Sequence, residues 1–178
     1  MARKRGTETI GDMVRSMLVV LIPVALVAGF VGLLRPSTAE VREVDWAGTL
    51  ETARESAEFA VLGPDELPEG WTATRVAYET GASAGDDAWR LNVVTDDGVY
   101  VGLVQRPGEL DRVVRAELPE FTADGTSLVD AETWQRYIDV DDEPGDHALV
   151  RQVGDTVVIV LTSAADYSLA ESFASSLR

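Results

Sequence analysis

An uncharged apolar run near the N-terminus is the feature that most constrains this chain. Residues 17–34 read MLVVLIPVALVAGFVGLL, eighteen residues without a charged side chain. A helix of that length rises roughly 27 Å, which is close to the hydrocarbon thickness of a bilayer. Residues 13–14 extend the run, and the guanidinium of Arg15 can reach the lipid headgroups. We therefore predict a transmembrane helix that begins at Met13, ends at Leu34 and places the chain in a lipid bilayer.

A cleaved signal peptide is the competing interpretation of the same run. The segment starts with positive charges, and Ser37, Thr38 and Ala39 offer a small-residue cleavage site. The apolar stretch of a signal peptide is usually about 7–15 residues long, and this one is longer. The length therefore favours an anchor that is retained.

The charges around the run predict its orientation and divide the chain into parts. Basic residues that flank a membrane span stay on the cytoplasmic side, and residues 3–5 read Arg-Lys-Arg. We expect residues 1–12 to be cytoplasmic, residues 35–44 to form a juxtamembrane linker, and residues 45–178 to form one extracytoplasmic domain. The expected location is the cell membrane, crossed once.

The exported part is strongly acidic. Residues 35–178 carry 11 basic and 29 acidic side chains, a net charge of −18. A surface of that sign repels phosphate backbones, so we expect no nucleic-acid partner. The chain has no cysteine and a single histidine, His147. This composition excludes disulfides, thiolate metal sites and cysteine nucleophiles, and we expect no cofactor.

Periodicity in the first half of the domain predicts helices at both ends of a set of strands. Asp45 can cap a helix whose apolar residues recur at helical spacing, and Asp97-Gly98 is a favoured two-residue hairpin turn. The elements expected here are a helix from Asp45, an edge strand at 59–62, a strand at 71–78, a hairpin of 89–93 with 99–104, and a helix at 110–118.

The second half predicts four strands and a closing helix. Residues 157–161 are apolar on both faces, so their strand should be central and covered on each side. Ser168 and Glu171 match a capping box at the start of the last helix. The strands expected here are 126–130, 133–140, 147–153 and 156–162. The resulting fold class is α+β: after the transmembrane helix, a mostly antiparallel twisted sheet packed with two or three helices.

The chain resembles an uncharacterised actinobacterial family of single-pass membrane proteins that carry a domain of unknown function. The matching features are the V-x-V-D-like stretch at 41–45, L-P-x-G-W at 67–71, V-G-L at 101–103 and the Ser-Leu end at 176–177. The domain is also similar, more loosely, to small sensor or carrier modules of bacterial envelope regulators, some with a Mog1/PsbP-like fold. The resemblance implies a location in the cell envelope and brings no catalytic residues with it.

Aromatic residues on the expected strands are the first candidate site. Tyr78, Trp89, Tyr100 and Tyr137 would line a pocket for a ligand if they shared one face. Aromatic side chains on strands more often belong to the core. Tyr100 is distinct, because it lies on the opposite face from Val101 and must be exposed or covered by a helix.

Carboxylates in one loop are the second candidate. Asp139, Asp141, Glu143 and Asp146 supply oxygen ligands of the kind that calcium prefers. Pro144 interrupts the spacing of an EF-hand, and a solvated acidic loop is the simpler interpretation.

A catalytic triad is the third candidate. His147 would need Ser163 or Ser168 as a nucleophile and an acid such as Asp146. The G-x-S-x-G pattern is absent around both serines. We therefore expect a protein that is not an enzyme, and the leading hypothesis is a membrane-anchored extracytoplasmic module that binds an envelope protein or ligand. A carrier or sensor for an apolar small molecule is the alternative, and an envelope hydrolase is the remote one.

Overall fold

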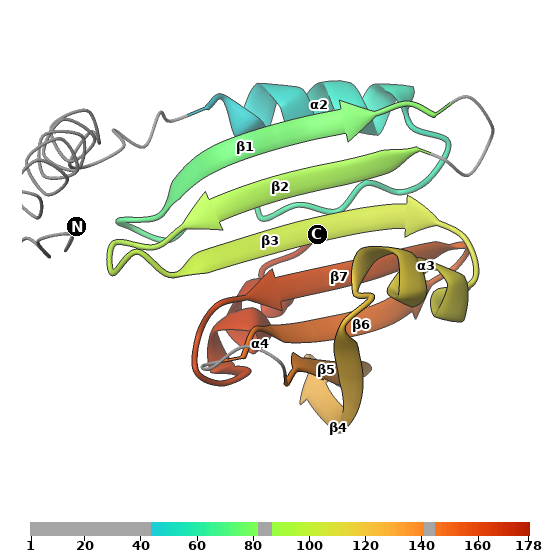
Figure 1. The fold of residues 1–178 in the computed structure, drawn as a ribbon. Coiled ribbons are helices and arrows are strands. Elements are labelled where there is room, and N and C mark those ends of the chain that lie inside the picture. The colour runs from blue at the N-terminus through green and yellow to red at the C-terminus, as the bar shows by residue number, and fades with distance from the viewer. Residues whose placement is uncertain (1–43, 82–86, 141–144) are drawn as a thin grey trace, which may run out of the picture. The chain divides into compact units, whose positions relative to one another are not determined.

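The structure is a computed structural model that describes residues 44–81, 87–140 and 145–178 (Figure 1). Three helices and seven strands lie within these ranges. In chain order they are α2 (Trp46–Ser56), β1 (Thr72–Glu79), β2 (Ala88–Val94), β3 (Tyr100–Pro107), α3 (Leu110–Glu117), β4 (Phe121–Val129), β5 (Glu132–Asp139), β6 (His147–Val153), β7 (Thr156–Thr162) and α4 (Ser168–Ser175).

All seven strands form one antiparallel sheet in the order β1-β2-β3-β7-β6-β5-β4. The chain builds it as two meanders, β1 to β3 and β4 to β7, which meet where β3 pairs with β7. Helix α3 connects the two meanders. The α+β class with an antiparallel sheet and three helices is confirmed, and β7 is central as its apolar sequence predicts.

Helices α2 and α4 cover one face of the sheet. The buried side chains on this face include Leu91, Leu103 and Val160 from the strands, with Ala53 from α2 and Phe173 from α4. Burying an aliphatic or aromatic side chain of this size contributes about 1.5–3 kcal/mol, so this cluster is the main source of stability.

The turn sequence before β1 belongs to the same packing. Trp71, the last residue of the L-P-x-G-W stretch, stacks on Phe173 of α4 with ring centroids 6.0 Å apart and planes 12° apart. That motif is therefore structural, because it fixes the start of β1 against the last helix.

Among the helices that the structure describes, only α3 covers the opposite face, and only in part. Its Val113 and Val114 pack on Val150, Val157 and Ile159 of β6 and β7. In Figure 1, α3 lies in front of β7 and β6, whereas none of the labelled helices lies in front of β1 and β2. This face therefore has a covered half and an open half.

Two sequence predictions near α2 have different outcomes. Asp45 caps the helix as expected, because its carboxylate accepts a hydrogen bond from Gly48 N at 3.1 Å. The predicted strand at 59–62 is wrong. The backbone of this segment forms hydrogen bonds with side chains instead of a neighbouring strand: Leu62 N donates to Gln105 Oε1 at 2.8 Å, and Val61 O accepts from Arg54.

Two predictions in the second half also need correction. The capping box is wrong, because Ser168 Oγ donates to Asp166 and Glu171 binds Arg136 of β5 and Ser127 of β4. Strand β4 begins at Phe121 rather than at residue 126, and a register shift between Ala123 and Thr126 interrupts its pairing with β5. The alternation that marks a strand is broken at that shift.

The predicted membrane span at 13–34 lies outside the described residues. Within residues 44–81, 87–140 and 145–178, none of the helices has the length and apolar character that crossing a membrane requires.

Candidate functional site

A hollow on the open half of the α3 face is the best candidate site. It encloses about 410 Å³ beside the C-terminal end of α3, a volume within the range of small-molecule sites. We call it the sheet hollow. Its lining residues are Arg75, Glu79, Arg90, Asn92, Tyr100, Val104, Glu117, Leu118, Ile159 and Leu161.

Strand register explains why these side chains share one face. Arg75 on β1 pairs with Asn92 on β2, which pairs with Gly102 on β3, which pairs with Leu161 on β7. Directly paired residues point to the same side of a sheet, so these four positions form one row across four strands.

Tyr100 lies over the glycine in this row. A Cβ built on Gly102 would clash with the Tyr100 hydroxyl oxygen and would stand 3.0 Å from the Tyr100 Cζ atom, which is tighter than nine in ten real Cβ contacts. Only glycine leaves room for the ring to rest on the backbone of β3. The glycine of the V-G-L sequence at 101–103 therefore leaves room for Tyr100 to line the sheet hollow.

The hydroxyl of Tyr100 makes no hydrogen bond to any residue that the structure describes. Burial raises the pKa of this hydroxyl above its usual value, and the charge of Asp146 adds to the effect while Arg90 and Arg75 oppose it. The group is therefore a neutral O–H at physiological pH, and it can donate a hydrogen bond to a ligand.

Two neighbouring side chains also keep donors available. The side-chain amide of Asn92 is bonded to none of the described residues. Arg75 uses one of its five N–H groups, because only Nη2 approaches Glu79 Oε1, at 3.4 Å. Asn92, Arg75 and the Tyr100 hydroxyl therefore offer donors from adjacent strands.

An ion-pair cluster closes the hollow where α3 ends. Glu117 Oε1 and Oε2 each accept from Arg90 at 2.9 Å, and Oε1 also accepts from Arg106 at 2.7 Å. Arg90 Nε donates to Glu79 at 3.2 Å. Although burial acts to raise it, the hydrogen bonds from Arg90 and Arg106 lower the pKa of Glu117 below its usual value. This carboxylate is consequently occupied by the protein itself.

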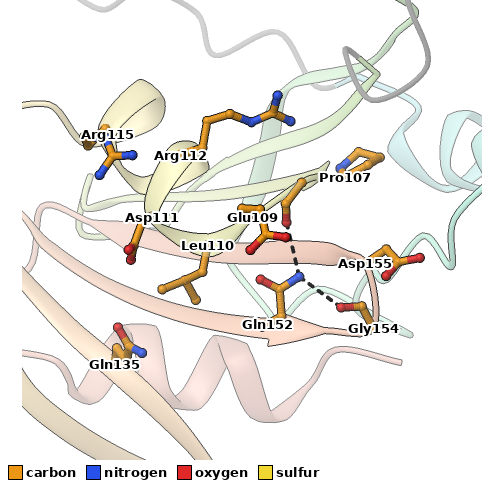
Figure 2. A pocket seen from close by; sticks show the side chains of 11 residues that line it. Pro107, Glu109, Leu110, Asp111, Arg112, Arg115, Gln135, Gln152, Gly154 and Asp155 are labelled. Atoms are coloured by element: carbon orange, nitrogen blue, oxygen red, sulfur yellow. Dashed lines mark hydrogen bonds between the residues drawn. The ribbon is translucent and has the colours of Figure 1, made fainter.

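A larger hollow of about 1190 Å³ lies at the other end of α3 (Figure 2). We call it the hairpin hollow, because it lies between the start of α3 and the β6–β7 turn and is lined by residues 107–112, Arg115, Gln135, Gln152, Gly154 and Asp155. Gln152 Nε2 donates to Gly108 O and Gly154 O, which ties the two segments together. Figure 2 shows Arg112, Arg115 and Asp155 pointing in different directions, so their charges do not converge on one point.

The four predicted aromatic residues do not share one pocket. Tyr78 pairs with Trp89 on the face covered by α2, and Trp89 is fully buried. Tyr100 and Tyr137 lie on the α3 face, where Tyr100 lines the sheet hollow and Tyr137 packs near α3. Only Tyr100 of the four therefore lines a hollow with unpartnered donors beside it.

The histidine and serines of the third candidate each have other partners. His147 Nδ1 lies 3.0 Å from Ala164 O, and its ring meets Tyr167 edge-on with centroids 4.6 Å apart. Ser163 Oγ accepts from Tyr100 N, while Ser168 Oγ donates to Asp166. Among the described residues, neither serine is hydrogen-bonded to His147.

The acidic loop lies partly outside the described residues, because Asp141 and Glu143 fall within 141–144. The residues that the structure does describe contain no group of three or more side chains placed to hold a metal ion. Asp139 N donates to Asp146 O at 2.9 Å across the base of this loop. The calcium site at Asp139, Asp141, Glu143 and Asp146 stays a prediction.

Sequence reasoning did not identify Arg75, Arg90 and Asn92 as site residues. The available signal was the placement of polar side chains at alternate positions of β1 and β2, where β7 is apolar on both faces. That contrast indicates an open half-face, but it does not show which strand lies beside which.

A comparison with known protein families identifies the family of this chain. The family described as "Protein of unknown function (DUF4245)" matches residues 5–177, and the chain belongs to it. Neither the curated proteins nor the solved structures include a significant match.

Proposed function

We propose that this chain is a membrane-anchored extracytoplasmic binding module and that the sheet hollow holds its ligand. The apolar run at 13–34 and the basic residues before it support the anchor and its orientation. The observation that carries the binding role is a set of donors that the described residues leave available, from Asn92, Tyr100 and the spare N–H groups of Arg75, beside a concave half-face that α3 leaves open.

Binding fits the hollow better than catalysis. A general base must be able to take a proton, yet Glu117 is held by Arg90 and Arg106 with its pKa lowered. The raised pKa of Tyr100 keeps its oxygen protonated, which suits a hydrogen-bond donor and not a nucleophile. These groups recognise a ligand without changing it.

The alternative, a carrier for an apolar molecule, has less support. A carrier of that kind would bury its cargo among apolar walls. The apolar lining of the sheet hollow comes from β3, β7 and the end of α3, and the strands β1 and β2 supply charged and polar groups. The apolar residues are Val104, Leu118, Ile159 and Leu161. This division favours a ligand with one polar end.

Photo-crosslinking in native membranes tests the binding role. A photoreactive residue at Ala77, which pairs with Arg90 on the same face, stands beside the hollow. The control position is Leu128, an exposed residue on the edge strand β4. We expect an adduct that forms from position 77 and not from position 128. The same adducts from both positions would contradict a ligand site at the sheet hollow.

A reporter fused after Arg178 tests the orientation. We expect a reporter that works only outside the cytoplasm to be active, and its cytoplasmic counterpart to be silent. Activity of the cytoplasmic reporter alone would overturn the proposed location.

A further inference from the structure

We propose that the sheet hollow binds a small carboxylate whose apolar part lies on Leu118, Ile159 and Leu161. This inference rests on the proposed function, because it gives a chemical class to the ligand of the same site.

The groups of the floor that can still make hydrogen bonds are mainly donors. Arg75 has N–H groups and no acceptor, and Tyr100 is protonated and donates through its O–H. The side-chain amide of Asn92 has two N–H donors and one carbonyl oxygen that accepts. A ligand that satisfies these groups must bring acceptors, and a carboxylate brings two oxygens that accept several hydrogen bonds at once.

One arginine of the hollow can turn to an anion. The charged side chains that line the hollow balance one another, with Arg75 and Arg90 against Glu79 and Glu117, whereas residues 35–178 as a whole carry a net charge of −18. Arg75 is the arginine with N–H groups to spare, since Arg90 already donates through three nitrogens.

The register places an apolar surface next to these donors. The row that begins with Arg75 and Asn92 continues through Gly102 to Leu161, and Leu118 and Ile159 lie beside it. A ligand with its anionic end on β1 and β2 would therefore lay a short apolar part over β7. The volume of about 410 Å³ suits a molecule of that size and not a long lipid.

The test uses the full chain in lipid nanodiscs and isothermal titration calorimetry, with empty nanodiscs as the blank. The probes are hexanoate, hexan-1-ol and hexylammonium, which have six carbon atoms each and differ in charge, together with inorganic phosphate. We expect hexanoate to bind at least tenfold more tightly than the alcohol, and hexylammonium to show no binding. Equal binding of all three six-carbon probes, or tighter binding of phosphate, would overturn the carboxylate assignment.

Variants locate the binding. We expect Arg75→Gln to weaken hexanoate binding about tenfold and Tyr100→Phe about threefold, as loss of a charged and a neutral hydrogen bond predicts. Arg115→Gln, an exposed arginine of α3 that lines the hairpin hollow instead, should stay within twofold of the unaltered chain. Hexanoate binding that is insensitive to Arg75→Gln and Tyr100→Phe would overturn the site.

Failure of this inference is distinguishable from failure of the proposed function. If an adduct forms from position 77 but hexanoate is not preferred, the chain is a binding module whose ligand is not a carboxylate. Hexanoate binding that depends on Arg75, without a site-specific adduct in membranes, would support the chemistry and contradict the biological role.

Discussion

Glu117→Gln is the substitution that should most disturb the α3 face without removing an apolar side chain. The Glu117 side chain is 12% exposed, and it accepts from Arg90 and Arg106, whose side chains are 25% and 24% exposed. The amide keeps one acceptor oxygen and loses the negative charge. Arg106 then stays partly buried without a counter-charge, and Arg90 keeps only the more exposed Glu79.

The expected cost follows from how deeply the cluster lies. Removing one partner of a fully buried ion pair costs about 3–5 kcal/mol, and a fully exposed pair is worth about 0–1 kcal/mol. For groups between these limits we expect the free energy of unfolding to fall by about 2–3 kcal/mol at pH 7. For a domain of this size, that loss lowers Tm by roughly 6–10 °C.

The cost should depend on pH in a defined direction. The folded-state pKa of Glu117 is lowered, so the stabilisation is fully present above the unfolded value, near 4.5, and is lost as the pH falls through the folded value. The difference between the unaltered chain and Glu117→Gln should therefore be constant from pH 7 to about pH 5.5 and should shrink below pH 4.5.

Urea unfolding of the full chain in detergent, followed by tryptophan fluorescence, measures this difference. All four tryptophans lie in the described residues, so the signal reports this domain. Glu79→Gln is the matched control: Glu79 also binds Arg90, but its side chain is 45% exposed, and we expect a change below about 0.5 kcal/mol. Equal effects of both substitutions, or a Glu117→Gln penalty that persists undiminished at pH 3, would refute the reasoning.

Three further substitutions test other local arguments by the same unfolding assay. Gly102→Ala should lower the free energy of unfolding by about 1–3 kcal/mol, because the new Cβ displaces the Tyr100 ring. This loss should vanish in a Tyr100→Ala background, and an unchanged loss there would place the clash elsewhere. Ala131→Gly should stabilise the domain by up to about 1 kcal/mol, because this alanine has a φ of +66°. The same change at Ala116, an exposed residue of α3, should destabilise the domain by about 1 kcal/mol. Two effects of the same sign would contradict the strain argument. Asp45→Ala should cost about 1 kcal/mol, measured against Asp45→Asn, which keeps a capping oxygen and should cost little.

The parts of the fold that the sequence predicted correctly depend on local signals. Asp97-Gly98 marks a hairpin turn, and Gly98 has the positive φ of +81° that such turns require. The uninterrupted apolar run at 157–161 identifies a strand covered on both faces, and β7 is that strand. Each signal involves residues within a few positions of one another, so no knowledge of the tertiary structure is needed.

The wrong predictions arise where a distant side chain overrides a local pattern. Residues 59–62 have the composition of a strand, but Gln105 of β3 takes the Leu62 N–H that a neighbouring strand would need. Ser168 and Glu171 have the spacing of a capping box, but Arg136 of β5 draws Glu171 away from the helix start. Those partners are 43 and 35 residues away, and only the sheet order brings them near.

The candidate site escaped sequence analysis for the same reason. The aromatic hypothesis grouped Tyr78, Trp89, Tyr100 and Tyr137 by residue type, and the sheet separates them onto two faces. Of these four residues, only Tyr100 had a local signal in the sequence, because it alternates with the apolar residues around it. The V-G-L stretch indicates a glycine next to Tyr100 on the same face of the strand. That Tyr100 lies near Arg75 follows only from the pairing of three strands.

The existence of an open half-face follows from the ratio of helices to strands. Seven strands at about 4.8 Å spacing make a sheet roughly 29 Å wide, and a helix about 10 Å across covers about two of them. Helices α2 and α4 lie on one face. Among the described helices, only the eight-residue α3 therefore covers the other face. Strands under α3 can be apolar on both faces, as β7 is, whereas β1 and β2 must keep polar side chains on the uncovered side. The sequence meets this requirement with Arg75, Arg90 and Asn92. Arg90 is held by Glu79 and Glu117, whereas Arg75 and Asn92 lie in one row with Leu161 of β7. The spare donors of Arg75 and Asn92 are what a ligand with an anionic end would recognise.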